Sequence, residues 1–365
     1  MHWGLSQEQE LFRDAFGEWL AAVAAPETLR KWLAAGDVRP FEERLVADGW
    51  LGVGFPEELG GQGGGLLEIA LAAEQLGYHG APGGSWLASV LAVPALVGPP
   101  GLAESVLAQG EFAALAVSAG QPPDGPGPVR YEGGAVHGTV PSVLGAGQAR
   151  YLIVPAWSGG GCDLFAVEAA DAGVSLRNRP LLDRSRSAAD VHLVGARARV
   201  LDVDGRQVLK DAAQRAAVLV AADSLGAAER MLHLAVDYSK QRKQFGVPIG
   251  SFQAVKHAAA TMLVAVESAR TIAYFAAASV DQGGAEAPLH AATAKAQVTA
   301  AAQHAADSAL TIHGAIGYTW EHDLQVFYKR AKLNVPLFGS PQVWNERLAT
   351  ELPLVPETVA TTASA

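Results

Sequence analysis

The spacing of the apolar residues changes twice along this chain, and this feature restricts the possible folds more than any other. In the first third, apolar side chains such as Phe12, Phe16 and Leu20 recur at three- and four-residue steps, a spacing that predicts amphipathic helices. Between 112 and 193 the apolar runs are short, rich in Val and Leu, and separated by Gly, Pro and Asp, which indicates strands. From 205 to about 352 the helical spacing returns.

Local signals place the ends of several of these elements. Ser6 is followed three residues later by Gln9, which is a capping-box signature, so the first helix is predicted to run from there to about Ala24. Further helices of the first third are predicted at 41–49, 66–76 and 85–97. Strands are predicted at 112–117, 136–140, 151–154, 164–167 and 191–193. In the last third, turns at 246–250, 282–288 and 314–318 separate long helices.

The order of these elements predicts an α+β chain built from three parts. Residues 1–110 are expected to form an N-terminal helical domain, and 111–204 a middle β domain shaped as a small barrel or sandwich. Residues 205–355 are expected to form a C-terminal four-helix bundle. The tail, 356–365, is rich in Thr and Ala without a periodic apolar face, so we expect it to be frayed.

Composition excludes several classes of function. Of the 365 residues, 50% are hydrophobic and 18% charged, a balance typical of packed globular proteins. The formal net charge of −10 opposes broad binding to nucleic acid or to anionic lipid. Cys162 is the only cysteine, which rules out an internal disulfide or a cysteine-based zinc cluster. We find no signal peptide and no uncharged run long enough to span a bilayer, so a cytoplasmic protein is expected.

A basic cluster precedes a Gly-Pro-Gly turn in the last third. The segment 237–257 contains Lys240, Arg242 and Lys243, followed by Phe245. Cations at the last turn of a helix stabilise its dipole, and this role alone would account for the cluster. The alternative is a pyrophosphate site, with the Arg242 guanidinium on phosphate oxygens and Phe245 against a ring.

A second motif, at 311–324, combines a glycine turn with a helix start. Gly314 and Gly317 mark the turn, and Thr319 with Asp323 suits the beginning of a helix. His313 and His322 belong to the same segment. No pair of candidate ligands has the i, i+4 spacing of a helical zinc site, so no metal site is predicted.

These two motifs resemble the acyl-CoA dehydrogenase family. The similarity lies in Arg-Lys-Gln-Phe-Gly-Val-Pro-Ile at 242–249 and in His-Gly-Ala-Ile-Gly-Tyr-Thr-Trp-Glu-His-Asp at 313–323, and the Gly-Phe-Pro-Glu-Glu-Leu-Gly-Gly turn at 54–61 also matches. The resemblance covers essentially the whole chain. It implies FAD bound between bundle and β domain at a subunit interface, with an acyl thioester against the flavin.

The resemblance also implies roles for individual residues. Arg242, Gln244 and Phe245 would contact a FAD held mainly by the neighbouring subunit, while Gly314 and Gly317 would approach its pyrophosphate. The segment 337–342 is similar to the family's Tyr-Glu-Gly-Thr-x-Gln segment, which makes Ser340 and Gln342 flavin contacts. Thr311 occupies the position of a usual Gln in the same cofactor region.

The chain departs from the family where the catalytic base is expected. Phe338 stands at the position of the glutamate, and about Ala216 stands at the alternative position on the first bundle helix. Neither side chain accepts a proton, although removal of the α-proton of a thioester requires a base. Two flavin-facing segments of the β domain, at 114–122 and 140–145, have also lost the family's residues.

Three functions follow as hypotheses. The first is a FAD-dependent dehydrogenase that desaturates an acyl-CoA or acyl-carrier thioester and passes electrons to a carrier, with Glu321 as a weak candidate base beside Asp223 and Glu346. The second is a base-lacking companion subunit, because this branch of the family includes heteromeric dehydrogenases of steroid side-chain breakdown. The third is a member repurposed for non-redox chemistry. A homo- or hetero-oligomer, a dimer or tetramer, is expected in the first two cases.

Overall fold

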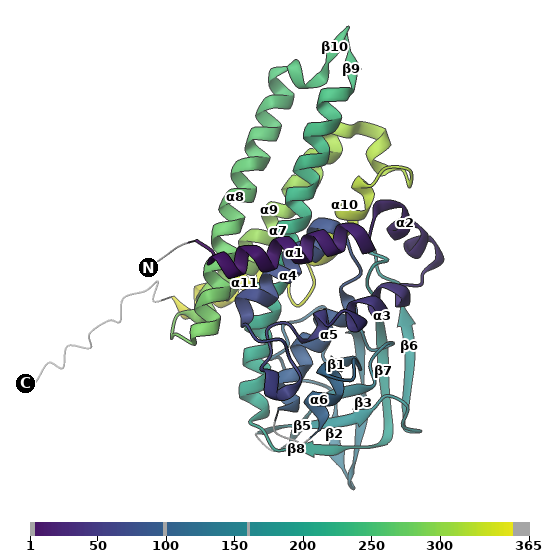
Figure 1. The fold of residues 1–365 in the computed structure, drawn as a ribbon. Coiled ribbons are helices and arrows are strands. Elements are labelled where there is room, and N and C mark those ends of the chain that lie inside the picture. Colours follow the sequence, from purple (N-terminus) through teal and green to yellow (C-terminus); the bar gives the residue numbers. More distant parts are fainter. Residues whose placement is uncertain (1–3, 98–100, 159–160, 353–365) are drawn as a thin grey trace, which may run out of the picture.

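The structure is a computed structural model that describes residues 4–97, 101–158 and 161–352. Figure 1 shows the strands of the middle part gathered at one end, the N-terminal helices across the middle, and a long helical hairpin that extends to the other end. The expected succession of helical, β and helical parts is therefore confirmed. The predicted frayed tail, 356–365, lies outside the described residues, so that prediction stays a prediction.

The N-terminal helices begin at the predicted capping box. Ser6 Oγ accepts from the Gln9 N–H, and the Gln9 side chain accepts in turn from the Ser6 N–H. Two helices that the periodicity missed, α2 and α6, are short. The elements of this part are α1 (Gln7–Val23), α2 (Pro26–Ala35), α3 (Arg39–Ala47), η1 (Trp50–Gly52), η2 (Glu57–Leu59), α4 (Leu66–His79), α5 (Gly84–Ala92), η3 (Val93–Leu96) and α6 (Leu102–Leu107).

The middle part consists of two four-stranded sheets with a shared apolar core, which corresponds to the sandwich and not to the barrel of the two predicted shapes. One sheet has the order β1-β4-β5-β8 and the other β2-β3-β7-β6. The strands β2, β6 and β8 escaped prediction because most of their residues are exposed and carry no apolar alternation. The strands are β1 (Ala113–Leu115), β2 (Arg130–Glu132), β3 (Ala135–Leu144), β4 (Tyr151–Ser158), β5 (Gly161–Glu168), β6 (Val174–Arg179), β7 (Ala188–Arg197) and β8 (Arg199–Leu201).

Three long helices and a shorter fourth form the bundle. The helix α7 packs against α8, α9 and α10, and α11 packs along α9. A two-stranded turn and a short η4 helix join α7 to α8, and η5 joins α9 to α10. The elements are α7 (Gly205–Gln241), β9 (Lys243–Gln244), β10 (Val247–Pro248), η4 (Ile249–Ser251), α8 (Gln253–Gln282), α9 (Ala287–His313), η5 (Gly314–Tyr318), α10 (Leu324–Asn334) and α11 (Pro341–Glu351).

Glycines allow the N-terminal part to approach the bundle closely. Gly77 on α4 and Gly226 on α7 lie where these two helices cross. A Cβ on Gly226 would come within 1.9 Å of the Glu74 carbonyl oxygen, and one on Gly77 within 2.1 Å of the Asp223 carbonyl oxygen. Any side chain would force the helices apart, because such contacts are far inside van der Waals distance.

A buried charged cluster connects the β part to the bundle. The Asp223 carboxylate on α7 accepts from Arg330 on α10 and lies 2.8 Å from the Arg186 guanidinium, which precedes β7. Asn334 donates to the same carboxylate at 2.6 Å. All four side chains are buried. Because an unpaired charge is costly in such surroundings, each member depends on the others.

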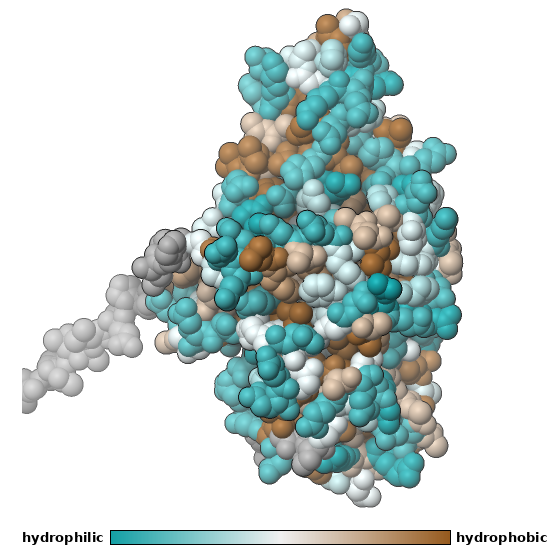
Figure 2. Space-filling model, viewed as in Figure 1, coloured by the Kyte–Doolittle hydropathy of each residue, from teal (hydrophilic) through white to brown (hydrophobic). Residues whose placement is uncertain are grey.

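The helix α8 leaves much of its surface open. By length and composition it would suffice to cross a membrane, in contrast to the sequence-based expectation, yet it packs as a bundle helix against α7 and α9. Only 28% of its most apolar window is buried. Leu263 is half exposed, and Val264 is two-thirds exposed. Figure 2 shows hydrophobic side chains at the far end of the α7–α8 hairpin and along its side.

Candidate functional site

The predicted cofactor residues fall into two groups at different places in the fold. The distal group lies at the far end of the α7–α8 hairpin and at η5, whereas the proximal group lies at the start of α11, beside the β part (Figure 1). Distal members are Arg242, Gln244, Phe245, Thr311, Gly314 and Gly317; proximal members are Ser340 and Gln342, with Phe338 at the base position.

The hairpin turn holds its side chains in solvent. Gln244 and Val247 pair across β9 and β10, and the Ile249 N–H donates to the Arg242 carbonyl, so the turn is ordered by its own backbone. Phe245 has a φ of 52°, a strained conformation for a bulky residue, and 92% of it is exposed. An ordered, strained and almost fully exposed phenylalanine indicates a surface built to meet another molecule.

A stacked ring pair brings η5 to the same end of the molecule. The His313 ring stacks on Tyr238 with 4.6 Å between centroids. Gly314 follows His313 directly, and Arg242 lies four residues beyond Tyr238 on α7, about 6 Å further along the helix. The two motifs that carry the family resemblance are therefore neighbours in space.

The glycines of η5 have different roles. Gly314 has a φ of 66°, and no atom lies within 4 Å of where a Cβ would stand, so its backbone is open to an approaching ligand. Gly317 is packed, since a Cβ there would come within 2.9 Å of Leu310. The Thr311 hydroxyl donates to the Asp307 carbonyl at 2.8 Å and is thus engaged within α9.

Burial disfavours the protonated form of both histidines near η5. His313 donates through Nδ1 to the Ala309 carbonyl at 2.7 Å, and its buried Nε2 has no partner. His322 Nδ1 accepts from the Leu324 N–H at 3.1 Å. Burial lowers the pKa of His313 and of His322. The exposed basic side chains at this end include those of the hairpin turn, Lys240, Arg242 and Lys243.

At the proximal end, the three segments that depart from the family pattern meet one another. The Phe338 N–H donates to the Ala119 carbonyl at 2.6 Å, and the Ala119 N–H donates to the Ser142 carbonyl at 3.0 Å. The Ser142 N–H donates to Asp190 Oδ1 at 3.0 Å. These backbone groups are thus satisfied within the chain. Phe338 is 3% exposed, so its phenyl ring is part of the core.

Further contacts hold this region closed. The Trp344 indole donates to the Phe338 carbonyl at 3.0 Å, and Arg347 pairs with Asp124 at 2.6 Å. Pro122 lies so close to Gly339 that a Cβ there would meet it at 3.0 Å. The loop before β2 is therefore fastened to the turn between α10 and α11.

Ser340 and Gln342 are placed differently. Ser340 caps α11, because its Oγ accepts from the Val343 N–H. Gln342 is exposed.

Lys295 fixes the turn that carries Phe338. This fully buried side chain of α9 donates to the carbonyls of Asn334, Val335 and Gly339 at 3.1, 3.0 and 2.8 Å. Burial lowers the pKa of Lys295 to about 7. A lysine in an alanine-rich helix forms no recognisable motif, so no sequence pattern predicts this role. Its place on the buried face of the helical period was the available signal.

None of the candidate bases is a free carboxylate in a pocket. Ala216 is fully buried on α7, and Glu321 and Glu346 are exposed. Asp223 is buried; burial alone would raise the pKa of its carboxyl, but Arg186 and Arg330 hold that pKa at about 2. An ion-paired carboxylate with so low a pKa is a poor proton acceptor at neutral pH.

Comparison with known proteins identifies the same relationship over the chain. Residues 6–99 match the acyl-CoA dehydrogenase N-terminal domain, and 204–352 match the acyl-CoA dehydrogenase C-terminal domain. The acyl-CoA dehydrogenase IpdE2 of Mycobacterium tuberculosis is 31% identical, over 95% of this chain and 98% of IpdE2. FadE34 of the same organism is 32% identical over 94% of this chain, which spans about half of FadE34 (48%).

A solved structure shares the fold. The ChsE4-ChsE5 complex from Mycobacterium tuberculosis contains a chain with a TM-score of 0.85 and 26% identity to this one. The alignment covers 98% of this chain and all of that chain.

Proposed function

The chain belongs to the acyl-CoA dehydrogenase family of oxidoreductases, and we propose that it is the base-lacking companion subunit of a heteromeric, FAD-dependent acyl-CoA dehydrogenase. One observation carries the proposal. At the base position, Phe338 is buried and its N–H is bonded to Ala119, whereas Phe245 at the far end is 92% exposed. The region around Phe338 is therefore packed within the chain, whereas the hairpin turn around Phe245 is exposed and available to a neighbouring subunit.

The distal group suits part of a FAD bound mainly by another subunit. In the described part of the chain, no carboxylate pairs with the Arg242 guanidinium, which leaves its fork available to phosphate oxygens. The open backbone at Gly314 allows a pyrophosphate close approach, and Phe245 offers an apolar face to a ring.

The proximal group does not suit a flavin. The backbone N–H groups at Ala119, Ser142 and Phe338 are already bonded within the chain, and Ser340 accepts at the start of α11.

The division of labour follows from the chemistry. Bound FAD supplies the hydride acceptor for α,β-desaturation of an acyl thioester, and removal of the α-proton requires a positioned base. Phe338 and Ala216 cannot provide one, so the partner supplies the carboxylate. This chain contributes cofactor binding through Arg242, Gln244 and Phe245.

Two of the relatives support a two-part arrangement. FadE34 is about twice as long as the region that matches this chain, and the ChsE4-ChsE5 structure is a complex. The exposed apolar side chains of the hairpin, Phe245, Leu263 and Val264, supply a surface for such a partner. The thioester, as CoA or carrier protein, and the electron carrier would bind to the assembled complex.

The test compares flavin content in the chain alone and co-expressed with an adjacent dehydrogenase-like gene, by visible absorption per mole of protein. We expect little flavin in the chain alone and stoichiometric flavin in the complex. Arg242→Gln should weaken FAD retention at least roughly tenfold, since charge-assisted hydrogen bonds are lost. Gln342→Ala, at the proximal group, should leave FAD retention unchanged.

The opposite pattern would overturn the companion role. If the chain alone retains FAD, and Gln342→Ala releases it, the protein is an active homo-oligomeric dehydrogenase with its own flavin site. Lys256→Gln, an exposed cation on the same hairpin, serves as the control for a general loss of charge.

A further inference from the structure

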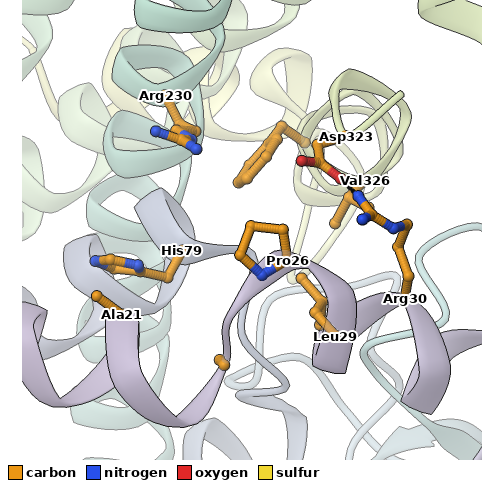
Figure 3. A pocket seen from close by; sticks show the side chains of 10 residues that line it. Ala21, Pro26, Leu29, Arg30, His79, Arg230, Asp323 and Val326 are labelled. Atoms are coloured by element: carbon orange, nitrogen blue, oxygen red, sulfur yellow. Dashed lines mark hydrogen bonds and ion pairs between the residues drawn. The ribbon is translucent and has the colours of Figure 1, made fainter. Parts of the chain in front are cut away.

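A cavity of about 210 Å³ lies between the N-terminal helices and the bundle, and none of the predicted cofactor residues lines it. Figure 3 shows Arg230 and His79 on one side of this cavity, the Arg30–Asp323 pair on the other, and Pro26 between them. These side chains come from the α1–α2 junction, from the end of α4, from α7 and from the start of α10.

The two polar side chains on the first side have unused hydrogen-bonding groups. In the described part of the chain, the Arg230 guanidinium makes no ion pair or hydrogen bond; it lies over the rings of Tyr78 and Phe327, at 5.5 and 6.0 Å from their centroids. His79 has an edge contact with Tyr78 and likewise no hydrogen-bond partner there. Two N–H donors from different helices thus face one cavity.

The charge inside the cavity is close to +1. Burial and the neighbouring Arg230 charge lower the pKa of His79 to about 4, so its imidazole is neutral at pH 7. Arg30 and Asp323 compensate each other in an ion pair. Arg230 is the remaining charge, and a monoanion would balance it.

The rest of the wall is apolar. It is formed by Ala21, Ala24, Pro26, Leu29, Val326 and Phe327. The volume is below the roughly 300–1,000 Å³ of pockets for drug-sized ligands, so the occupant must be small. Among the described residues that line the cavity, Arg230 is the one cation without an ion pair, so a second acidic group would lack a counter-charge. This disfavours a phosphate dianion.

We propose that this cavity binds a small carboxylate with a short apolar body, the carboxylate on Arg230 and His79 and the body against Leu29 and Phe327. The guanidinium fork matches a carboxylate in bidentate geometry, and the neutral imidazole adds one donor. The site is separate from the companion role, and either proposal can fail without the other.

Calorimetry on the full chain with cyclohexanecarboxylate as the probe tests the proposal. The carboxylate should bind, and the uncharged cyclohexanecarboxamide should bind at least roughly tenfold more weakly. Arg230→Gln should weaken carboxylate binding by a similar factor, whereas Arg177→Gln, an exposed cation on β6, should leave it unchanged.

A pair of neighbouring alanines provides a second, steric test. Ala21 lines the cavity and Ala22 does not, and both are exposed on α1, so either substitution should leave the fold intact. Ala21→Leu should abolish binding by filling the space, and Ala22→Leu should preserve it, with circular dichroism unchanged in both.

Several outcomes would overturn the proposal. One is that the carboxamide or inorganic phosphate binds as tightly as the carboxylate. Another is that Arg230→Gln or Ala21→Leu leaves the affinity for the carboxylate unchanged. The last is that no binding is detected with the probe at about 10 mM, a concentration at which a specific site would be occupied.

Discussion

Replacing Asp223 by Asn should destabilise the protein strongly, because it removes the charge that two buried arginines share. The carboxylate bonds to Arg330 at 2.8 Å and lies 2.8 Å from Arg186, and both arginines are buried. Breaking a buried pair by removing one partner costs about 3–5 kcal/mol. The lowered pKa of the Asp223 carboxyl has the same cause: Arg186 and Arg330 favour its ionised form in the folded protein, and a neutral asparagine cannot replace that charge.

Differential scanning calorimetry measures this loss. With about 2.1 cal/mol/K of unfolding entropy per residue, the 365 residues give about 0.8 kcal/mol/K, so Asp223→Asn should lower the Tm by roughly 4–6 °C. Asp237→Asn is the matched control on the same helix. Its pair with Lys240 at 3.1 Å is exposed, and such pairs contribute about 1 kcal/mol at most.

The dependence on pH gives an independent check. The pKa of Asp223 is lower in the folded protein than in the unfolded chain. Its contribution to the free energy of unfolding is therefore complete above about pH 4 and is lost as the pH falls toward 2. The difference in Tm between wild type and Asp223→Asn should shrink over that range. Equal Tm values for Asp223→Asn and Asp237→Asn at pH 7 would refute the reasoning.

Two further predictions concern a close helix contact and a buried hydrogen-bond donor. Gly226→Ala should lower the free energy of unfolding by about 1–3 kcal/mol or more, because its Cβ would meet the Glu74 carbonyl at 1.9 Å. Gly17→Ala is the control, because its Cβ would meet only the flexible Gln75 side chain, at 2.8 Å. That substitution should leave the free energy of unfolding unchanged or raise it by up to about 1 kcal/mol. Urea denaturation distinguishes the two, and equal losses would contradict the packing argument. Lys295→Met should destabilise by about 1–3 kcal/mol, because three buried carbonyls lose their donor; an unchanged urea midpoint would show that water replaces the amine.

The sequence predicted most of the element types and one cap in detail. The Ser6–Gln9 box starts α1 as expected, because a cap depends on residues only three apart. The strands with apolar alternation were found, and β6, which is mostly exposed, was not. The choice between barrel and sandwich depended on which strands pair, and strand pairing is a non-local property.

The sequence by itself determined where most of the helices lie and where the strands with apolar alternation lie. It also carried the two motifs of the family and the loss of a carboxylate at Phe338 and Ala216. Only the tertiary structure decided which of these residues meet. It placed Ala119 between Ser142 and Phe338, and it paired Asp223 with an arginine 107 residues away. The physical reason is that helix and turn preferences are set by near neighbours, whereas ion pairs, closed sites and cavities arise when distant segments pack together.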